Sequence, residues 1–277
     1  MMMLEVLAVL AASIGIGIIS SILGIGGGSL YVPLMVLGLG VEGKTAVGTS
    51  LFIILFTAIS STLAYAKEKL VDYELAVILS LGTVPGSILG AYMTKYISSS
   101  WLIIAFSMFL WLTAARMLTS SRAHRERGED PQNKGNMRNL TDAGGRAFEY
   151  RVRLKPGIAA GFAAGFVSSL LGIGGGVVMV PAMNLLVGVP IHLSVAASML
   201  IICFTSSSGL IVHWTLRQVS LNLGILIAVG ACLGAQIGAR IAYRLQPSTL
   251  KILFGVTLIL VSARMLLLGV SSLPSGR

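Results

Sequence analysis

Two glycine-rich motifs contain the residues of this chain whose types and spacing could do chemistry. Gly24–Gly28 reads Gly-Ile-Gly-Gly-Gly and recurs, 148 residues later, as Gly172–Gly176; a Val-Pro pair follows each at the same interval. Glycines in such a run can break a helix and leave backbone N–H groups free, and free N–H groups at a helix start attract anions. The motifs therefore favour two anion-binding turns. Their predicted site residues are Gly26, Gly27, Gly28 and Pro33, with Gly174, Gly175, Gly176 and Pro181.

The glycines admit two other interpretations. A nucleotide-binding loop would need a strand before it and a long helix after it, and the sequence offers no such context. Close packing of helices through glycine is the structural alternative, since small residues let helix backbones approach each other in a membrane. The recurrence together with the Val-Pro pairs favours the broken-helix interpretation, in which proline fixes the break because it lacks an N–H.

Hydroxyl side chains downstream of each motif could add hydrogen-bond donors to the turns. Thr49 and Ser50 follow the first motif, and Ser198 follows the second at the position matching Ser50. Ala197 replaces the threonine in the second half, so a hydroxyl pair there would be asymmetric. The alternative role for these side chains is ordinary hydrogen bonding between helices.

The distribution of acidic residues argues against cation transport and against an active site. All ten Asp and Glu residues lie at or before Glu149, and those of the first half lie at the ends of apolar runs. Carboxylates in mid-membrane are what cation sites and proton relays use. Cys203 and Cys232 have no metal-ligand spacing around them. We therefore predict no catalytic residues, no metal site and no cofactor.

The composition is that of an integral membrane protein. Apolar residues make up 55% of the 277 residues, charged residues only 11%, and the mean hydropathy is +0.90. These values exclude a soluble enzyme, a disordered chain and a disulfide-built secreted domain. The net charge of +10 does not indicate nucleic-acid binding, because the basic residues lie mostly between apolar runs without interleaved aromatics.

The repeat predicts an all-α polytopic fold made of two tandem homologous halves. Each half reads as four long helices and one short Gly/Pro-broken piece, which gives eight full-length spans and two short helices. An eleven-residue piece rises only about 16 Å, half the thickness of the hydrocarbon core. Short broken segments at matching positions in two halves are a pointer to a transporter's binding site. In the first half the long helices are expected at 4–21, 45–66, 75–93 and 101–118; the short pieces are expected at 29–39 and 177–187.

The chain divides into four parts: a first membrane repeat at 1–118, a polar cytoplasmic linker at 119–155, a second membrane repeat at 156–270 and a short tail at 271–277. We expect the linker to be a flexible tether, with 121–148 not needed for transport. If the short pieces cross the membrane, there are ten spans in inverted repeats; if they are re-entrant, there are eight in parallel repeats. Either arrangement puts 15 of the 20 basic residues on the cytoplasmic side, so the positive-inside rule does not distinguish ten spans from eight.

With the doubled Gly-x-Gly-Gly-Gly-x-x-x-Val-Pro motif and Thr49-Ser50-Leu51, the chain resembles the TauE/SafE family of sulfite exporters over both halves. The resemblance implies a multi-pass protein of the cytoplasmic membrane that moves small anions such as sulfite and organosulfonates. We expect a secondary transporter that works as an exporter. Its expected partners are a small anionic substrate and the lipid bilayer, with no nucleic acid. The alternatives are a passive anion channel and a non-transporting membrane scaffold or assembly factor. The oligomeric state is left open.

Overall fold

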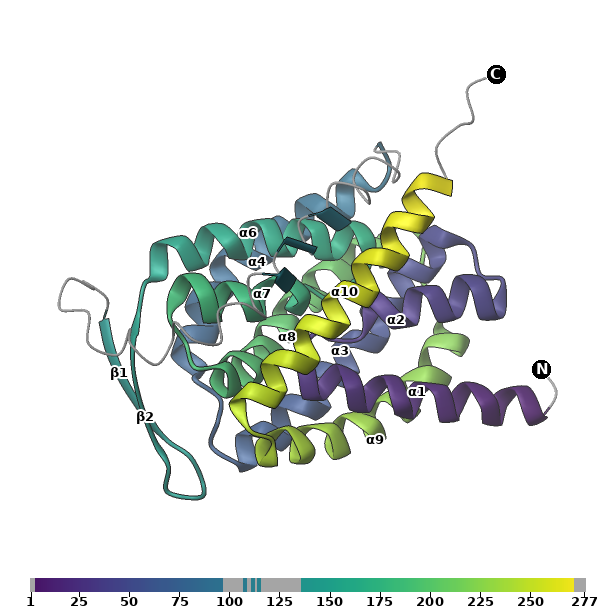
Figure 1. Cartoon of the computed structure of the whole chain (residues 1–277). Helices are drawn as coiled ribbons and strands as arrows, with labels where there is room; N and C mark the ends of the chain where they lie inside the picture. Colours follow the sequence, from purple (N-terminus) through teal and green to yellow (C-terminus); the bar gives the residue numbers. More distant parts are fainter. Residues whose placement is uncertain (1–2, 97–106, 109–110, 113, 116–135, 272–277) are drawn as a thin grey trace.

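The structure is a computed structural model that describes residues 3–96, 107–108, 111–112, 114–115 and 136–271; these are mostly helical (Figure 1). Most of the helix expected at 101–118 lies outside the described residues. The same holds for 119–135, the first part of the expected linker.

Seven described helices are long and apolar enough to cross a membrane. An 18-residue helix already rises about 27 Å, close to the thickness of the hydrocarbon core. Large apolar side chains such as Leu81, Ile211 and Leu260 are exposed on their outer faces, as lipid contact requires. The long helices are α1 (Met3–Leu23), α3 (Gly43–Lys67), α4 (Tyr73–Met93), α6 (Leu154–Leu171), α8 (Ile191–Thr215), α9 (Leu221–Arg244) and α10 (Pro247–Ser271).

Two short helical segments follow the glycine motifs. The first is α2 (Gly28–Pro33), which widens into the π-helical turn η1 (Leu34–Gly38). The second is α7 (Gly176–Ala182), which widens into η3 (Met183–Val187). In each segment the glycines start the helix, and the proline lies next to the junction with the π-helical turn, so the break itself is made by glycine.

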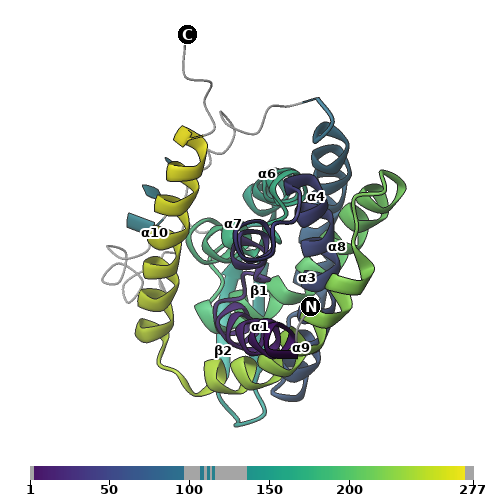
Figure 2. The ribbon, with the colours of Figure 1, turned by 90° about the vertical axis from the view of Figure 1, so that its right-hand side faces the viewer.

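Two rows of glycines, one on α9 and one on α4, pack against helices from the other half of the sequence; we call these contacts the glycine seams. On α9, a Cβ at Gly230, Gly234 or Gly238 would collide with backbone or side-chain atoms of α1. On α4, Gly82, Gly86 and Gly90 meet backbone carbonyls of α6 in the same way. Backbones this close gain dispersion contacts that larger residues would prevent. Figure 2 shows α1 lying against α9, α4 beside α6, and α10 standing at one side of the bundle.

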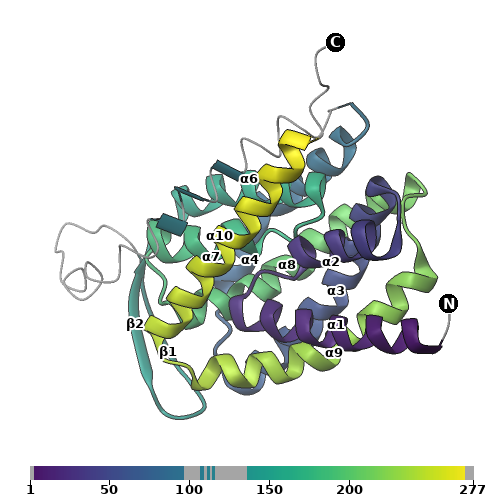
Figure 3. The ribbon, with the colours of Figure 1, turned by 45° about the vertical axis from the view of Figure 1, so that its right-hand side comes forward.

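A β-hairpin replaces the flexible tether expected for the second part of the linker. Strand β1 (Asn136–Thr141) pairs antiparallel with β2 (Ala147–Val152), and Thr141 faces Ala147 at the turn. Exposure alternates along β2: Tyr150 and Val152 are buried, whereas Glu149 and Arg151 are exposed. This period of two fits a strand that packs one face against the helices. The hairpin lies at the end of the bundle opposite the start of α1 (Figures 1 and 3).

Candidate functional site

Both glycine motifs form the same tight, left-handed turn between a long helix and a short one. Gly24, Gly26 and Gly27 have φ angles of 70°, 81° and 85°. Their counterparts Gly172, Gly174 and Gly175 have φ angles of 67°, 93° and 72°. Side chains disfavour this region of φ, so the glycines are needed for the backbone path itself.

The two turns touch each other in the interior of the bundle. A Cβ at Gly28 would collide with the carbonyl oxygen of Gly172, and a Cβ at Gly176 would collide with that of Gly24. Ile54 and Ile202, at the middle of α3 and α8, complete the surroundings. The structure therefore brings together the six predicted glycines from two segments that are far apart in sequence.

Ser50 and Ser198 tie each turn to the opposite half of the chain. The Ser50 hydroxyl donates to the carbonyl of Gly172 at 2.9 Å, or to that of Val47 at 2.7 Å. The Ser198 hydroxyl donates to the carbonyl of Gly24 at 2.8 Å, or to that of Val195 at 2.7 Å. Both side chains are fully buried. In this conformation both serine hydroxyls donate their protons to carbonyls. They therefore satisfy carbonyl acceptors of the turns and accept nothing from the N–H groups of the turns.

Unpaired donors gather at the first turn. No hydrogen bond among the described residues uses the N–H groups of Gly26, Gly27, Gly28 or Ser29. The hydroxyls of Ser20, Ser29 and Tyr31 are also buried and without a partner within the described part of the chain. Ser20 lies beside Gly27: its oxygen is 3.1 Å from the place a Cβ would occupy there. Backbone N–H groups and hydroxyls in a buried concave turn are the groups that bind anions.

The second turn has fewer unpaired donors. The N–H of Gly176 donates to the carbonyl of Gly174 at 2.9 Å. The N–H groups of Gly174, Gly175 and Val177 have no acceptor among the described residues. One buried hydroxyl, that of Ser168, lies next to Gly175 without a partner there.

Three other predicted site residues lie apart from these donors. The Thr49 hydroxyl accepts a hydrogen bond from the backbone N–H of Ser220 at 2.9 Å, which links α3 to the start of α9. Pro33 and Pro181 lie a helical turn beyond the glycines, at the ends of α2 and α7. Sequence reasoning missed Ser20, Ser29 and Tyr31. Ser20 could have been found, because it recurs as Ser168 at the repeat interval just before each motif.

The hydrogen bonds of Ser50 and Ser198 to the opposite turn should contribute to the stability of the fold. We expect Ser50→Ala and Ser198→Ala each to lower the free energy of unfolding by about 1–3 kcal/mol, because a buried glycine carbonyl loses its donor. Ser80→Ala is the matched control, since the Ser80 hydroxyl donates only within its own helix, to Val77. Reversible denaturant titration in detergent measures the difference. Equal losses in all three variants would contradict a special role of the cross-half bonds.

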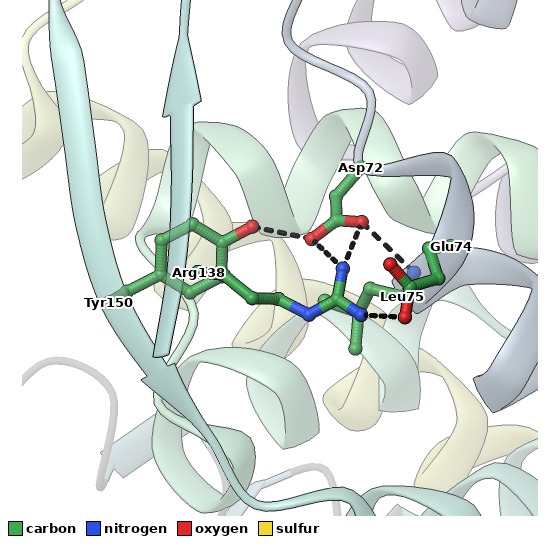
Figure 4. A network of polar contacts seen from close by, with 5 residues as sticks. All are labelled: Asp72, Glu74, Leu75, Arg138 and Tyr150. Carbon is green, nitrogen blue, oxygen red and sulfur yellow. Dashed lines mark hydrogen bonds and ion pairs between the residues drawn. The ribbon is translucent and has the colours of Figure 1, made fainter. Parts of the chain in front are cut away.

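A second polar cluster lies where the hairpin meets the helices, and Figure 4 shows it. Asp72 begins α4 by accepting from the N–H of Leu75 at 2.9 Å. The Arg138 guanidinium donates to both Asp72 oxygens at 2.8 and 3.0 Å, and reaches Glu74 at 2.6 Å. The Tyr150 hydroxyl donates to Asp72 at 2.6 Å, and burial together with that carboxylate raises the pKa of Tyr150. These carboxylates, with β1, line an open cavity of about 580 Å³.

The groups of this cluster satisfy one another. Asp72 accepts from three donors, and Arg138 is paired with two carboxylates. Among the described residues no group of three or more His, Cys, Asp or Glu side chains could hold a metal ion. The cluster therefore fastens the hairpin to the turn between α3 and α4.

Comparison with known proteins identifies relatives along the whole chain. The family model described as "Sulfite exporter TauE/SafE" matches residues 9–265. The chain is 36% identical over 276 residues to the probable membrane transporter protein YunE of Bacillus subtilis (strain 168), which covers 97% of this chain and 98% of that protein. It is 28% identical to the probable membrane transporter protein MJ0441 of Methanocaldococcus jannaschii, over 91% of this chain and 92% of that protein. No solved structure matches the chain significantly.

Proposed function

Because the chain belongs to the TauE/SafE family of membrane transporters, we propose that it is a secondary transporter that exports small anions, such as sulfite or organosulfonates, across the cytoplasmic membrane. The family and its relatives are described as transporters rather than enzymes. In the proposal, the anion is held between the short broken helices of the two halves, and transport is driven by an ion gradient or by the membrane potential.

One observation carries the anion assignment. The turns present backbone N–H groups and hydroxyls without acceptors, deep in a bundle whose described spans contain no mid-membrane carboxylate. A buried donor without an acceptor costs about 1–3 kcal/mol, and an anion would remove that cost. Ser50 and Ser198 support the proposal indirectly, because they occupy the carbonyls that would repel an anion.

We further propose that the two halves are homologous repeats of inverted orientation, in which the short segments each complete a crossing. The matching helices α3 and α8 start and end 148 residues apart. The hairpin contacts the end of α3, through the carbonyl of Glu68, and the end of α9, through Tyr243. Only the ten-span arrangement puts both of these ends on the linker's side of the membrane, so these contacts favour it over eight spans.

An uptake screen in proteoliposomes tests the function. Sulfite, sulfate, thiosulfate, small sulfonates and carboxylates are offered in turn, with and without an imposed ion gradient or potential. We expect saturable uptake of at least one sulfur oxoanion, accumulated against its gradient when the driving force is present. Uptake that only equilibrates would make the protein a passive channel. If correctly inserted protein took up no anion at all, the transporter proposal would be rejected in favour of a non-transporting scaffold.

A further inference from the structure

The two glycine turns share a backbone path but differ in the side chains around it. Ser29 and Tyr31 of the first turn correspond, at the repeat interval, to Val177 and Met179 of the second. The first turn therefore has two hydroxyls that the second lacks. It also keeps the N–H of Gly28 unpaired, whereas the matching N–H of Gly176 is bonded to Gly174.

The hydroxyls of Ser20, Ser29 and Tyr31 are buried and donate to no acceptor among the described residues. Ser20 and Tyr31 are fully buried, and Ser29 is 8% exposed. The Tyr31 ring lies against Gly27, as expected for a helix side chain that points back toward the helix start. The Thr57 hydroxyl lies beside the Tyr31 hydroxyl and gives its own proton to the carbonyl of Ile53 at 2.8 Å, so toward Tyr31 it can act only as an acceptor. Native proteins rarely leave several buried polar groups unpaired in one place.

The described atoms nearest to the first turn belong to uncharged residues. The atoms that border Gly24–Gly28 belong to serine, tyrosine, glycine, valine and isoleucine residues. Neutral donors can compensate one negative charge over several oxygens. A second charge is far more costly to bury, because the cost of removing an ion from water grows with the square of its charge.

We propose that the first turn is the ligand-binding turn, that it takes a singly charged oxoanion in preference to a doubly charged one, and that the second turn serves the packing of the fold. Ser20, Ser29 and Tyr31 are its specificity-determining residues. The inference rests on the proposed function and refines it: the transported anion is bound by one half of the repeat.

Methanesulfonate and sulfate test the charge preference, because both are tetrahedral oxoanions and they differ in net charge. Binding to purified full-length protein in detergent is measured by calorimetry. We expect methanesulfonate to bind at least about 10-fold more tightly than sulfate. Equal or tighter binding of sulfate would overturn the single-charge part of the inference.

Ser20→Ala and its repeat counterpart Ser168→Ala test which turn binds. Both remove a buried, unpaired hydroxyl beside a left-handed glycine. We expect Ser20→Ala, and likewise Tyr31→Phe, to weaken methanesulfonate binding by about 10-fold or more, as loss of a donor to a charged ligand does. Ser168→Ala should leave the affinity within about 2-fold.

The ligand-free proteins supply a second readout. Removing an unpaired hydroxyl breaks no hydrogen bond, so Ser20→Ala should leave thermal stability unchanged or raised while affinity falls. A similar loss of affinity in Ser168→Ala would overturn the assignment to one turn. Unchanged affinity in Ser20→Ala and Tyr31→Phe would overturn it too, while the parent's binding still supports an anion transporter. If the parent bound and carried no anion at all, the proposed function itself would fail.

Discussion

Gly28→Ala and Gly176→Ala are expected to destabilise the protein by about 4 kcal/mol or more. The new Cβ would overlap the backbone carbonyl of Gly172 in the first case and of Gly24 in the second. Backbone atoms inside two touching turns have no room to shift, and overpacking of this kind belongs to the large, exceptional class of mutational effects. Anion binding should be lost together with the fold in both variants, because the two turns pack against each other.

Gly15→Ala is the matched control for this substitution. Gly15 lies in α1, and outside its own helix backbone a Cβ there would have no heavy atom of the described residues within 4 Å. Alanine is the better helix former, so stability should be unchanged or raised by up to about 1 kcal/mol. Unfolding midpoints of purified, monodisperse protein in detergent separate the variants. Normal stability of Gly28→Ala would mean that the turns do not lie in contact.

Asp72→Asn is expected to detach the hairpin and to cost about 1.5–3 kcal/mol. Asparagine can still begin α4, but it removes the negative charge that holds Arg138 and the strong acceptor of the Tyr150 hydroxyl. Asp72 and Arg138 are largely buried, at 7% and 16% side-chain exposure, so solvent screens their ion pair only in part. The local readout is faster hydrogen exchange in 136–152, with α9 as the internal reference.

Glu74→Gln controls for charge alone. Glu74 contacts the same guanidinium, but its side chain is 74% exposed. Exposed ion pairs contribute under about 1 kcal/mol, so exchange in the hairpin should change little. If Glu74→Gln and Asp72→Asn loosened the hairpin equally, the buried position of Asp72 would not be what fastens it.

The helices were predictable from the sequence because the apolar runs are long and their ends are marked by charge or glycine. The expected helices at 45–66 and 75–93 correspond to α3 and α4 within two residues, and the short piece at 29–39 corresponds to α2 with η1. Which helices pack together was not predictable. Glycine spacing on α4 and α9 indicates a close approach, but periodicity in one helix does not identify its neighbour.

The hairpin was missed because charge obscured its pattern. Phe148, Tyr150 and Val152 alternate with Ala147, Glu149 and Arg151, a period of two in a segment whose overall composition is polar. At the candidate site, the recurrence of the motif pointed to the glycines. Ser29 and Tyr31 were not, because they have no recurring partner, and only burial without hydrogen-bond partners distinguishes them from packing residues.

The glycine seams also constrain how this chain can be completed during synthesis. The close partner of α1 is α9, and α1 ends at Leu23 while α9 begins at Leu221. The partner of α4 is α6, which lies beyond the hairpin. A chain that has emerged only as far as the linker therefore presents two helix faces whose partners do not yet exist. We therefore expect the full chain to fold as one cooperative unit. Separately expressed halves should be stable only when both are present, because each half covers the glycine seams of the other.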